Sequence, residues 1–115
     1  KMQIFPQFKA ALITLTREEQ NRFHYMKGDT EGLVNIPLSI KDICFSVFLR
    51  EDTEKDLIRV SLRSRGNVDV NLFAGRYFEG GGHKNAAGGK SFVSMEETIQ
   101  HYIDSVEEYH QEGLV

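Results

Sequence analysis

Residues 80–89, Gly-Gly-Gly-His-Lys-Asn-Ala-Ala-Gly-Gly, constrain the fold of this chain more than any other stretch. Three consecutive glycines are incompatible with a stable helix, and residues this small bury little apolar surface. Glycine permits a positive φ and lets the backbone approach a ligand closely, while successive N–H groups in a loop can form a concave anion site. The run therefore predicts a phosphate- or nucleotide-binding loop. A flexible glycine linker that carries an incidental histidine is the alternative.

The segments around this run predict a single α/β domain with a mixed β-sheet flanked by helices. A continuous apolar run at residues 10–15 indicates a strand that is covered on both faces. Residues 43–51 and 57–63 alternate between apolar and polar side chains, and the polar turn between them predicts a hairpin. An acidic metal site in that turn is the weaker interpretation. Residues 16–19 and 94–97 match capping boxes, which predict that a helix begins at each position.

The remaining elements are predicted from shorter patterns. Apolar residues at positions 70, 73, 74 and 77 predict a helix that is capped by Asp69 and ends at Gly80. A short helical turn is expected within residues 33–40 and a strand at residues 90–93, and Gly113 should close the last helix. We expect residues 1–9 to lead into the domain from a preceding one, so that residues 1–115 are one domain of a longer protein.

The charge distribution limits the kinds of partner. With 14 basic and 17 acidic residues the net charge is −3, which argues against a broad surface for duplex nucleic acid. Six Lys and Arg residues nevertheless fall within residues 59–90, against two acidic ones, so the positive surplus surrounds the glycine run. Cys44 is the single cysteine, which excludes an internal disulfide and fits a reducing cytoplasm. No apolar stretch is long enough to cross a membrane, so we expect a cytoplasmic protein without a membrane partner.

His83 and Arg63 are the main candidates for binding an anion. An imidazole can be charged near neutral pH, and a bound phosphate favours the charged form. Metal ligation and a structural role are the alternatives for His83, although no second ligand follows it at metal-binding spacing. The planar guanidinium of Arg63 suits two phosphate oxygens, unless Arg63 is merely an exposed residue at a strand end. Ser64, Asn71 and Lys84 are candidate helpers, and Asn71 could instead bond its own backbone at the helix start.

The residues of a hydrolytic centre are missing from the sequence. It contains no Asp-His-His triplet and no group of aspartates and histidines able to hold two divalent metals. Ser64 lacks a partnered base and is therefore no candidate nucleophile. We predict that this chain holds a substrate and contributes no catalytic residue and no metal ligand.

Residues 80–89 resemble the GGGHxxAAG signature of the DHH-associated substrate-binding domain, which follows the catalytic domain in DHH-family phosphoesterases. Residues 60–64 (Val-Ser-Leu-Arg-Ser), 68–71 (Val-Asp-Val-Asn) and 73–74 (Phe-Ala) are similar to that family's approach to the motif. Residues 28–35 (Gly-Asp-Thr-Glu-Gly-Leu-Val-Asn) look like a segment of the oligoribonuclease and nucleotide-phosphatase branch. The resemblance runs from about residue 10 to the C-terminus.

This resemblance implies a domain that grips the phosphate or terminal nucleotide of short single-stranded RNA or of 3′-phosphoadenosine 5′-phosphate. It also implies a preceding DHH domain, absent here, whose ligands usually hold manganese. The alternatives are the substrate domain of a cyclic dinucleotide phosphodiesterase and a non-catalytic RNA-binding module related to the C-terminal region of alanyl-tRNA synthetases. His83 counts against the latter, and a pure dimerisation domain would leave the glycine run unexplained, although homodimer formation stays open. The predicted substrate-binding residues are Arg63, Ser64, Asn71, Gly80, Gly81, Gly82, His83, Lys84, Ala86, Ala87 and Gly88.

Overall fold

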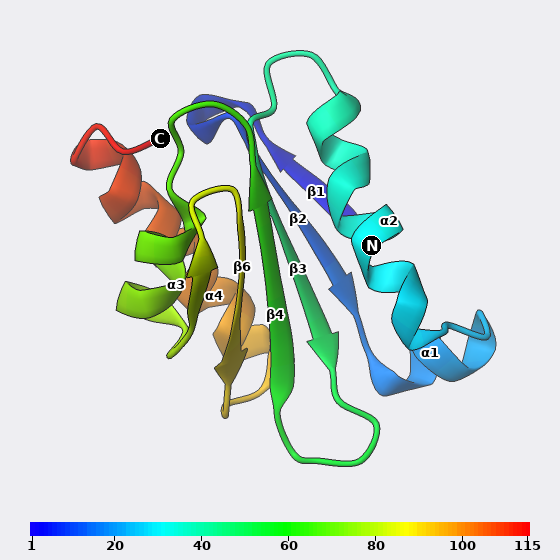
Figure 1. Cartoon of the computed structure of the whole chain (residues 1–115). Coiled ribbons are helices and arrows are strands. Elements are labelled where there is room, and N and C mark those ends of the chain that lie inside the picture. Colours follow the sequence, from blue (N-terminus) through cyan, green and yellow to red (C-terminus); the bar gives the residue numbers. More distant parts are fainter.

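The structure is a computed structural model that describes residues 1–115, with side chains for residues 1–26 and 28–115. A six-stranded mixed sheet carries helices on both faces (Figure 1). The strands are β1 (Met2–Phe5), β2 (Ala10–Leu15), β3 (Phe45–Glu51), β4 (Ile58–Ser64), β5 (Gly81–His83) and β6 (Ala86–Ser91). The α-helices are α1 (Arg17–Arg22), α2 (Thr30–Asn35), α3 (Val70–Tyr77) and α4 (Met95–Gln111), and 3-10 turns lie at Pro6–Phe8, Lys27–Asp29 and Ile36–Ser39. This architecture confirms the predicted α/β class.

The strand order is β1-β2-β3-β4-β6-β5. Strands β2 and β3 are parallel, and every other neighbouring pair is antiparallel. A parallel pair needs a crossover connection, and α1 and α2 lie within the one that joins β2 to β3. In Figure 1 these two helices lie on one side of the sheet, and α3 and α4 lie on the other.

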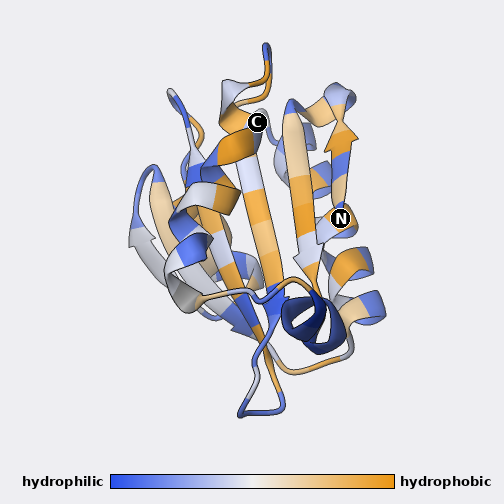
Figure 2. Cartoon of the chain, turned by 90° about the vertical axis from the view of Figure 1, so that its right-hand side faces the viewer, coloured by the Kyte–Doolittle hydropathy of each residue, from blue (hydrophilic) through white to orange (hydrophobic). Residues whose placement is uncertain are grey.

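The main hydrophobic core lies between the sheet and helices α3 and α4. Strand β4 shows the arrangement most clearly, because Ile58, Val60 and Leu62 are buried in this core while the alternate residues point to the opposite face. Phe73 and Tyr102 bring large aromatic side chains from α3 and α4, and both are fully buried. Figure 2 shows the hydrophobic residues concentrated along the strands. Burying one such side chain stabilises the fold by about 1.5–3 kcal/mol.

The predicted helix boundaries are confirmed where side chains define them. Thr16 with Glu19, and Ser94 with Glu97, form complete capping boxes. The Asp69 carboxylate accepts a hydrogen bond from the N–H of Leu72 at 3.0 Å and caps α3. Gly113 has a φ of 76° and follows Glu112, the C-cap residue of α4, as a glycine that closes a helix should.

Three local expectations differ from the structure. Residues 2–5 form the edge strand β1, because their N–H and C=O groups pair with β2 in the register Met2↔Ile13 to Phe5↔Ala10. The strand predicted at residues 90–93 instead spans Ala86–Ser91, since it pairs with β4 along that length. Helix α3 ends at Tyr77, and Glu79, with a φ of 51°, makes the turn expected at Gly80. None of the described helices is both long and apolar enough to cross a membrane.

Candidate functional site

The glycine run forms a β-hairpin in which β5 pairs with β6. The register is Gly81↔Gly88, Gly82↔Ala87 and His83↔Ala86, with Lys84 and Asn85 in the turn. A Cβ atom on Gly80 would lie 1.9 Å from the carbonyl oxygen of Gly88, so only glycine fits where the two strands meet. This corrects the expectation of an open loop with a nest of free N–H groups. The glycines allow the backbone of residue 80 to approach that of residues 88 and 89 closely, and not the backbone to approach a ligand.

Three of the predicted helper residues fasten this hairpin to the sheet and to α3. The Asn71 side-chain oxygen accepts a hydrogen bond from the N–H of Gly82 at 2.8 Å. The Ser64 hydroxyl donates to the carbonyl oxygen of Val68 at 2.6 Å and accepts from the Asn85 side-chain amide at 2.8 Å. The carbonyl oxygen of Lys84 accepts from the N–H of Val70 at 2.8 Å. Ser64, Asn71 and Lys84 therefore hold the hairpin in place, and their contact with a substrate stays a prediction.

The sheet register brings His83 and Arg63 to the same face. His83 lies opposite Ala86 on β6, and Ala86 lies opposite Arg63 on β4. Residues directly opposite in neighbouring strands point to the same side, so both side chains lie on the face away from α3 and α4. Two strand spacings separate their backbones, about 10 Å. Ala86 lies between them, and Gly88 lies on the same face two residues further along β6. These small residues form a shallow floor that is flanked by two basic side chains.

Arg63 is held in this position by helix α2. Its guanidinium donates to both carboxylate oxygens of Glu31, from Nε at 2.9 Å and from Nη2 at 2.8 Å. Nη1 donates to the carbonyl oxygen of Leu62 at 2.8 Å and to that of Ala87 at 3.3 Å. The Arg63 guanidinium, helped by the side-chain amide of Asn35, lowers the pKa of Glu31 to about 2. The sequence indicated residues 31 and 35 only as part of a family-like segment, because the pairing crosses 32 residues of chain.

The other predicted residues have different surroundings. His83 is exposed on the hairpin, whereas Ala87 is buried in the main core with an exposed fraction of 8%. Gly82 has a φ of 155°, and a Cβ there would lie 2.7 Å from the carbonyl oxygen of Ala86. Gly80 and Gly82 thus build the hairpin backbone, while Gly81 belongs to the same sheet face as His83. Among the side chains that the structure describes, no group of three or more His, Cys, Asp or Glu residues could hold a metal ion.

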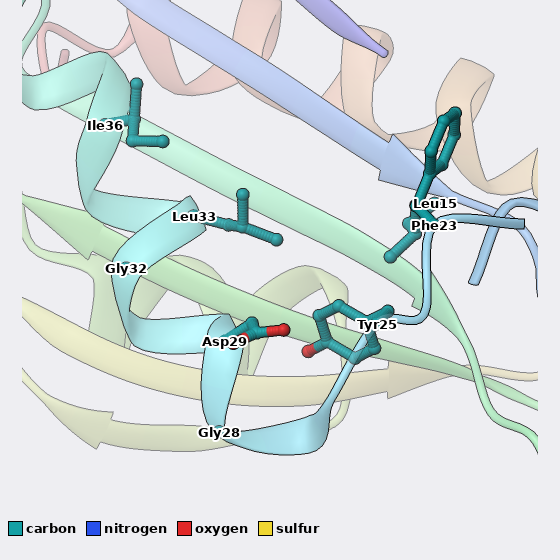
Figure 3. A pocket seen from close by; sticks show the side chains of 8 residues that line it. All are labelled: Leu15, Phe23, Tyr25, Gly28, Asp29, Gly32, Leu33 and Ile36. Atoms are coloured by element: carbon teal, nitrogen blue, oxygen red, sulfur yellow. The ribbon is translucent and has the colours of Figure 1, made fainter. Parts of the chain in front are cut away.

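A cavity of about 660 Å³ lies away from this row, between α2 and the segment that follows α1 (Figure 3). Its lining is mostly apolar and comprises Leu15, Phe23, Tyr25, Gly28, Asp29, Gly32, Leu33 and Ile36. The Tyr25 hydroxyl is hydrogen-bonded to that of Thr30, so the aromatic ring is fixed beside α2. This cavity was not predicted from the sequence. The sequence signal for it was weak, since Phe23 follows a polar segment and both Phe23 and Ile36 are exposed.

Comparison with known proteins gives the family. The profile of the DHHA1 domain matches residues 10–112. A 3′,5′-cyclic-nucleotide phosphodiesterase of Helicobacter pylori is 33% identical over 69 residues, which is 54% of this chain and 20% of that protein.

Solved structures agree with this match. An exopolyphosphatase-related protein from Bacteroides fragilis has 51% identity and a TM-score of 0.89, over 95% of this chain and 32% of its own. The pGpG-specific phosphodiesterase PggH from Vibrio cholerae shares the fold at 17% identity and a TM-score of 0.63, over 96% of this chain and 35% of its own. The chain thus spans about a third or less of each of these relatives. Its hairpin, its sheet order and its sequence together make it a member of the DHHA1 domain family, the DHH-associated domain of phosphoesterases.

Proposed function

We propose that this domain binds a phosphate group of a nucleotide substrate between His83 and Arg63. The observation that carries the proposal is the row His83–Ala86–Arg63, which places an exposed imidazole and a guanidinium on one face with no bulky side chain between them. Two donor side chains whose backbones are about 10 Å apart can contact oxygens of one phosphodiester segment from its two sides. The small floor residues leave room for the nucleotide to lie flat on the sheet.

Glu31 occupies the guanidinium fork in the protein without a ligand. Its carboxylate has the bidentate geometry that a phosphate group would adopt on the same guanidinium. The side chain of Glu31 is 66% exposed, so a phosphate could replace it if this side chain rotated away from Arg63 and from the Asn35 amide. Arg63 itself is 19% exposed and stays fixed by its bonds to Leu62 and Ala87. Because the guanidinium is already fixed before the ligand binds, less conformational entropy is lost on binding.

Short single-stranded RNA and 3′-phosphoadenosine 5′-phosphate are the substrates that we propose. The support is the segment of residues 28–35, which resembles the oligoribonuclease and nucleotide-phosphatase branch and whose Glu31 meets Arg63. A cyclic dinucleotide is the second candidate, and it shares a cyclic 3′,5′-phosphodiester chemistry with the cyclic nucleotides named for the relative from Helicobacter pylori. Both candidates present the phosphodiester or phosphate group that the row would recognise.

The hydrolytic step belongs, in this proposal, to a DHH domain in the same polypeptide. The chain spans 32% of the Bacteroides relative, which leaves ample length there for a second domain. A divalent metal, manganese by resemblance, would be held in that domain and would activate water and stabilise the leaving oxygen. The DHHA1 domain would orient the scissile bond. We therefore expect no metal-dependent hydrolysis by residues 1–115 alone.

Calorimetric titration of the isolated domain tests the binding role. Ligands would be 3′-phosphoadenosine 5′-phosphate, a linear diadenylate and a cyclic dinucleotide, against the unmodified domain and the variants His83→Ala and Arg63→Ala. Each charge-assisted bond is worth about 1.5–3 kcal/mol, so either variant should weaken binding roughly ten- to a hundredfold. The order of the three affinities distinguishes the substrate classes.

Matched controls come from the opposite side of the domain. Arg76 forms an ion pair with Glu112 at 2.9 Å, so Arg76→Ala removes a similar exposed pair away from the proposed site. His101 is exposed on α4 and serves as the control for His83. Equal losses in the control and test variants, or no loss in either test variant, would contradict the proposed site.

A further inference from the structure

A second group of basic side chains lies on the same sheet face, at the other end of β3 and β4. Arg50 and Arg59 are directly opposite each other in the β3–β4 register. Two like charges at such a position repel and destabilise the pair unless an anion lies between or beside them. Arg59 has such a partner, because its Nε donates to the Asp52 carboxylate at 3.2 Å. Arg50 has none.

The environment of Arg50 is unusual for an arginine. The residue is 8% exposed, yet its guanidinium makes no hydrogen bond or ion pair with any residue that the structure describes. Its guanidinium lies over the ring of Tyr25, whose centroid is 5.6 Å from the central guanidinium carbon. Cation–π contact leaves all five N–H donors without an acceptor. The fully buried side-chain atoms that lack a partner in the described structure are Ser46 Oγ and Tyr102 Oη, so the Arg50 nitrogens remain accessible and can donate charge-assisted hydrogen bonds to an added anion.

The donors face a cavity of about 320 Å³. Arg50, Arg59 and Lys55 contribute three positive charges to its lining, and Asp52 and Glu54 contribute two negative ones. The Asp52 carboxylate is already engaged, because it also accepts from the N–H groups of Glu54 and Lys55 at 3.0 and 2.8 Å. These bonds lower the pKa of Asp52 to about 2 and tie its charge to the turn. A volume of this size exceeds that of several water molecules and admits a tetrahedral oxyanion.

From these contacts we infer a second anion site, in which Arg50, Arg59 and Lys55 bind a phosphate group. Guanidinium groups bind phosphate oxygens in pairs, and Lys55 adds a mobile point charge at the rim. The site is separate from the His83–Arg63 row, because Arg59 precedes Arg63 by four residues in β4, about 13 Å along the strand. It does not depend on the function proposed for that row. The phosphate could be free in solution or part of a nucleotide.

NMR titration of the unmodified domain tests this site through the arginine Nε–Hε resonances. Inorganic phosphate and adenosine 5′-monophosphate would be added separately in a chloride buffer. We expect the Arg50 and Arg59 resonances to shift and saturate with inorganic phosphate. A lower Kd for the monophosphate would identify a nucleotide as the source, and equal Kd values would identify free phosphate. An Arg50 resonance that stays unchanged while only Arg63 shifts would overturn the inference.

Three variants test which side chains contribute to the affinity for phosphate. Arg50→Met keeps the length of the side chain and should weaken phosphate binding at least tenfold, whereas Arg22→Met, which removes an exposed arginine of α1, should leave it unchanged. Lys55 lies in an exposed turn, so Lys55→Ala should fold normally. Its expected severalfold loss of phosphate affinity tests the site if Arg50→Met does not fold. Loss of binding at this site in His83→Ala, or its retention in Lys55→Ala, would also contradict the assignment.

Discussion

Replacing Gly80 with alanine tests whether the glycine at this position is required by the packing of the hairpin or by the binding of a ligand. The new Cβ would lie 1.9 Å from the carbonyl oxygen of Gly88 and 2.6 Å from the Cα of Gly89. Both neighbours are backbone atoms, so no side-chain rotation can relieve the overlap. Overpacking costs about 1–3 kcal/mol, and a clash with rigid backbone belongs at the upper end. We therefore expect a loss of roughly 3 kcal/mol in the free energy of unfolding.

Urea denaturation of the domain without any ligand measures this loss. Each kcal/mol lowers the Tm of a domain near this size by roughly 4 °C or more, so the Tm should also fall by about 12 °C. Gly32→Ala is the matched control, because nothing lies within 4 Å of its added methyl group and alanine favours a helix by up to about 1 kcal/mol. If Gly80→Ala unfolded within about 0.5 kcal/mol of the unmodified domain, the close approach of β5 to β6 would be refuted. A ligand-binding loop would then be the better explanation of the glycines.

Glu31→Gln should raise the affinity for 3′-phosphoadenosine 5′-phosphate about 1.5- to fivefold, because exposed ion pairs contribute about 0.2–1 kcal/mol and the phosphate would no longer displace one from Arg63. Calorimetry checks this, and a weaker affinity would show that Glu31 positions Arg63 for the ligand. The folded-state pKa of Asp52, about 2, lies below its ordinary 3.8, so its stabilisation is present above pH 3.8 and is lost as the pH falls towards 2. Asp52→Asn should flatten the unfolding free energy over that window, and an unchanged acid profile would contradict the assigned bonds. The logarithm of the nucleotide affinity should fall with the logarithm of salt concentration at a slope matching one or two phosphate contacts, whereas a slope near that of duplex-binding proteins would indicate an extended nucleic-acid surface.

Local sequence patterns predicted the elements that local interactions determine. The capping boxes at Thr16 and Ser94 involve residues three positions apart, and the alternation in β4 reflects burial of one face. The glycine signature also identified the family correctly. In each case the pattern and the interaction that enforces it lie within a few residues of each other.

Features that depend on pairing between distant segments were not predictable from the sequence alone. The hairpin exists because Gly80 and Gly82 allow β5 to approach β6, whereas the sequence could show only that glycine permits some close approach. The ion pair between Glu31 and Arg63 requires α2 to lie against β4. The low exposure of Arg50 was not predictable either, because it depends on the Tyr25 ring, which comes from the segment after α1 and lies against the guanidinium.

The short edge strands affect how this domain behaves at high concentration. Strand β5 has three residues and β1 has four, and they form the two ends of the sheet. An unpaired edge can recruit a strand from another molecule, but a short edge offers few N–H and C=O groups to such a strand. The turn at Pro6 limits β1 further, because proline cannot donate to a ladder. The sheet is therefore poorly suited to grow by intermolecular strand addition, and the domain should resist aggregation by this route.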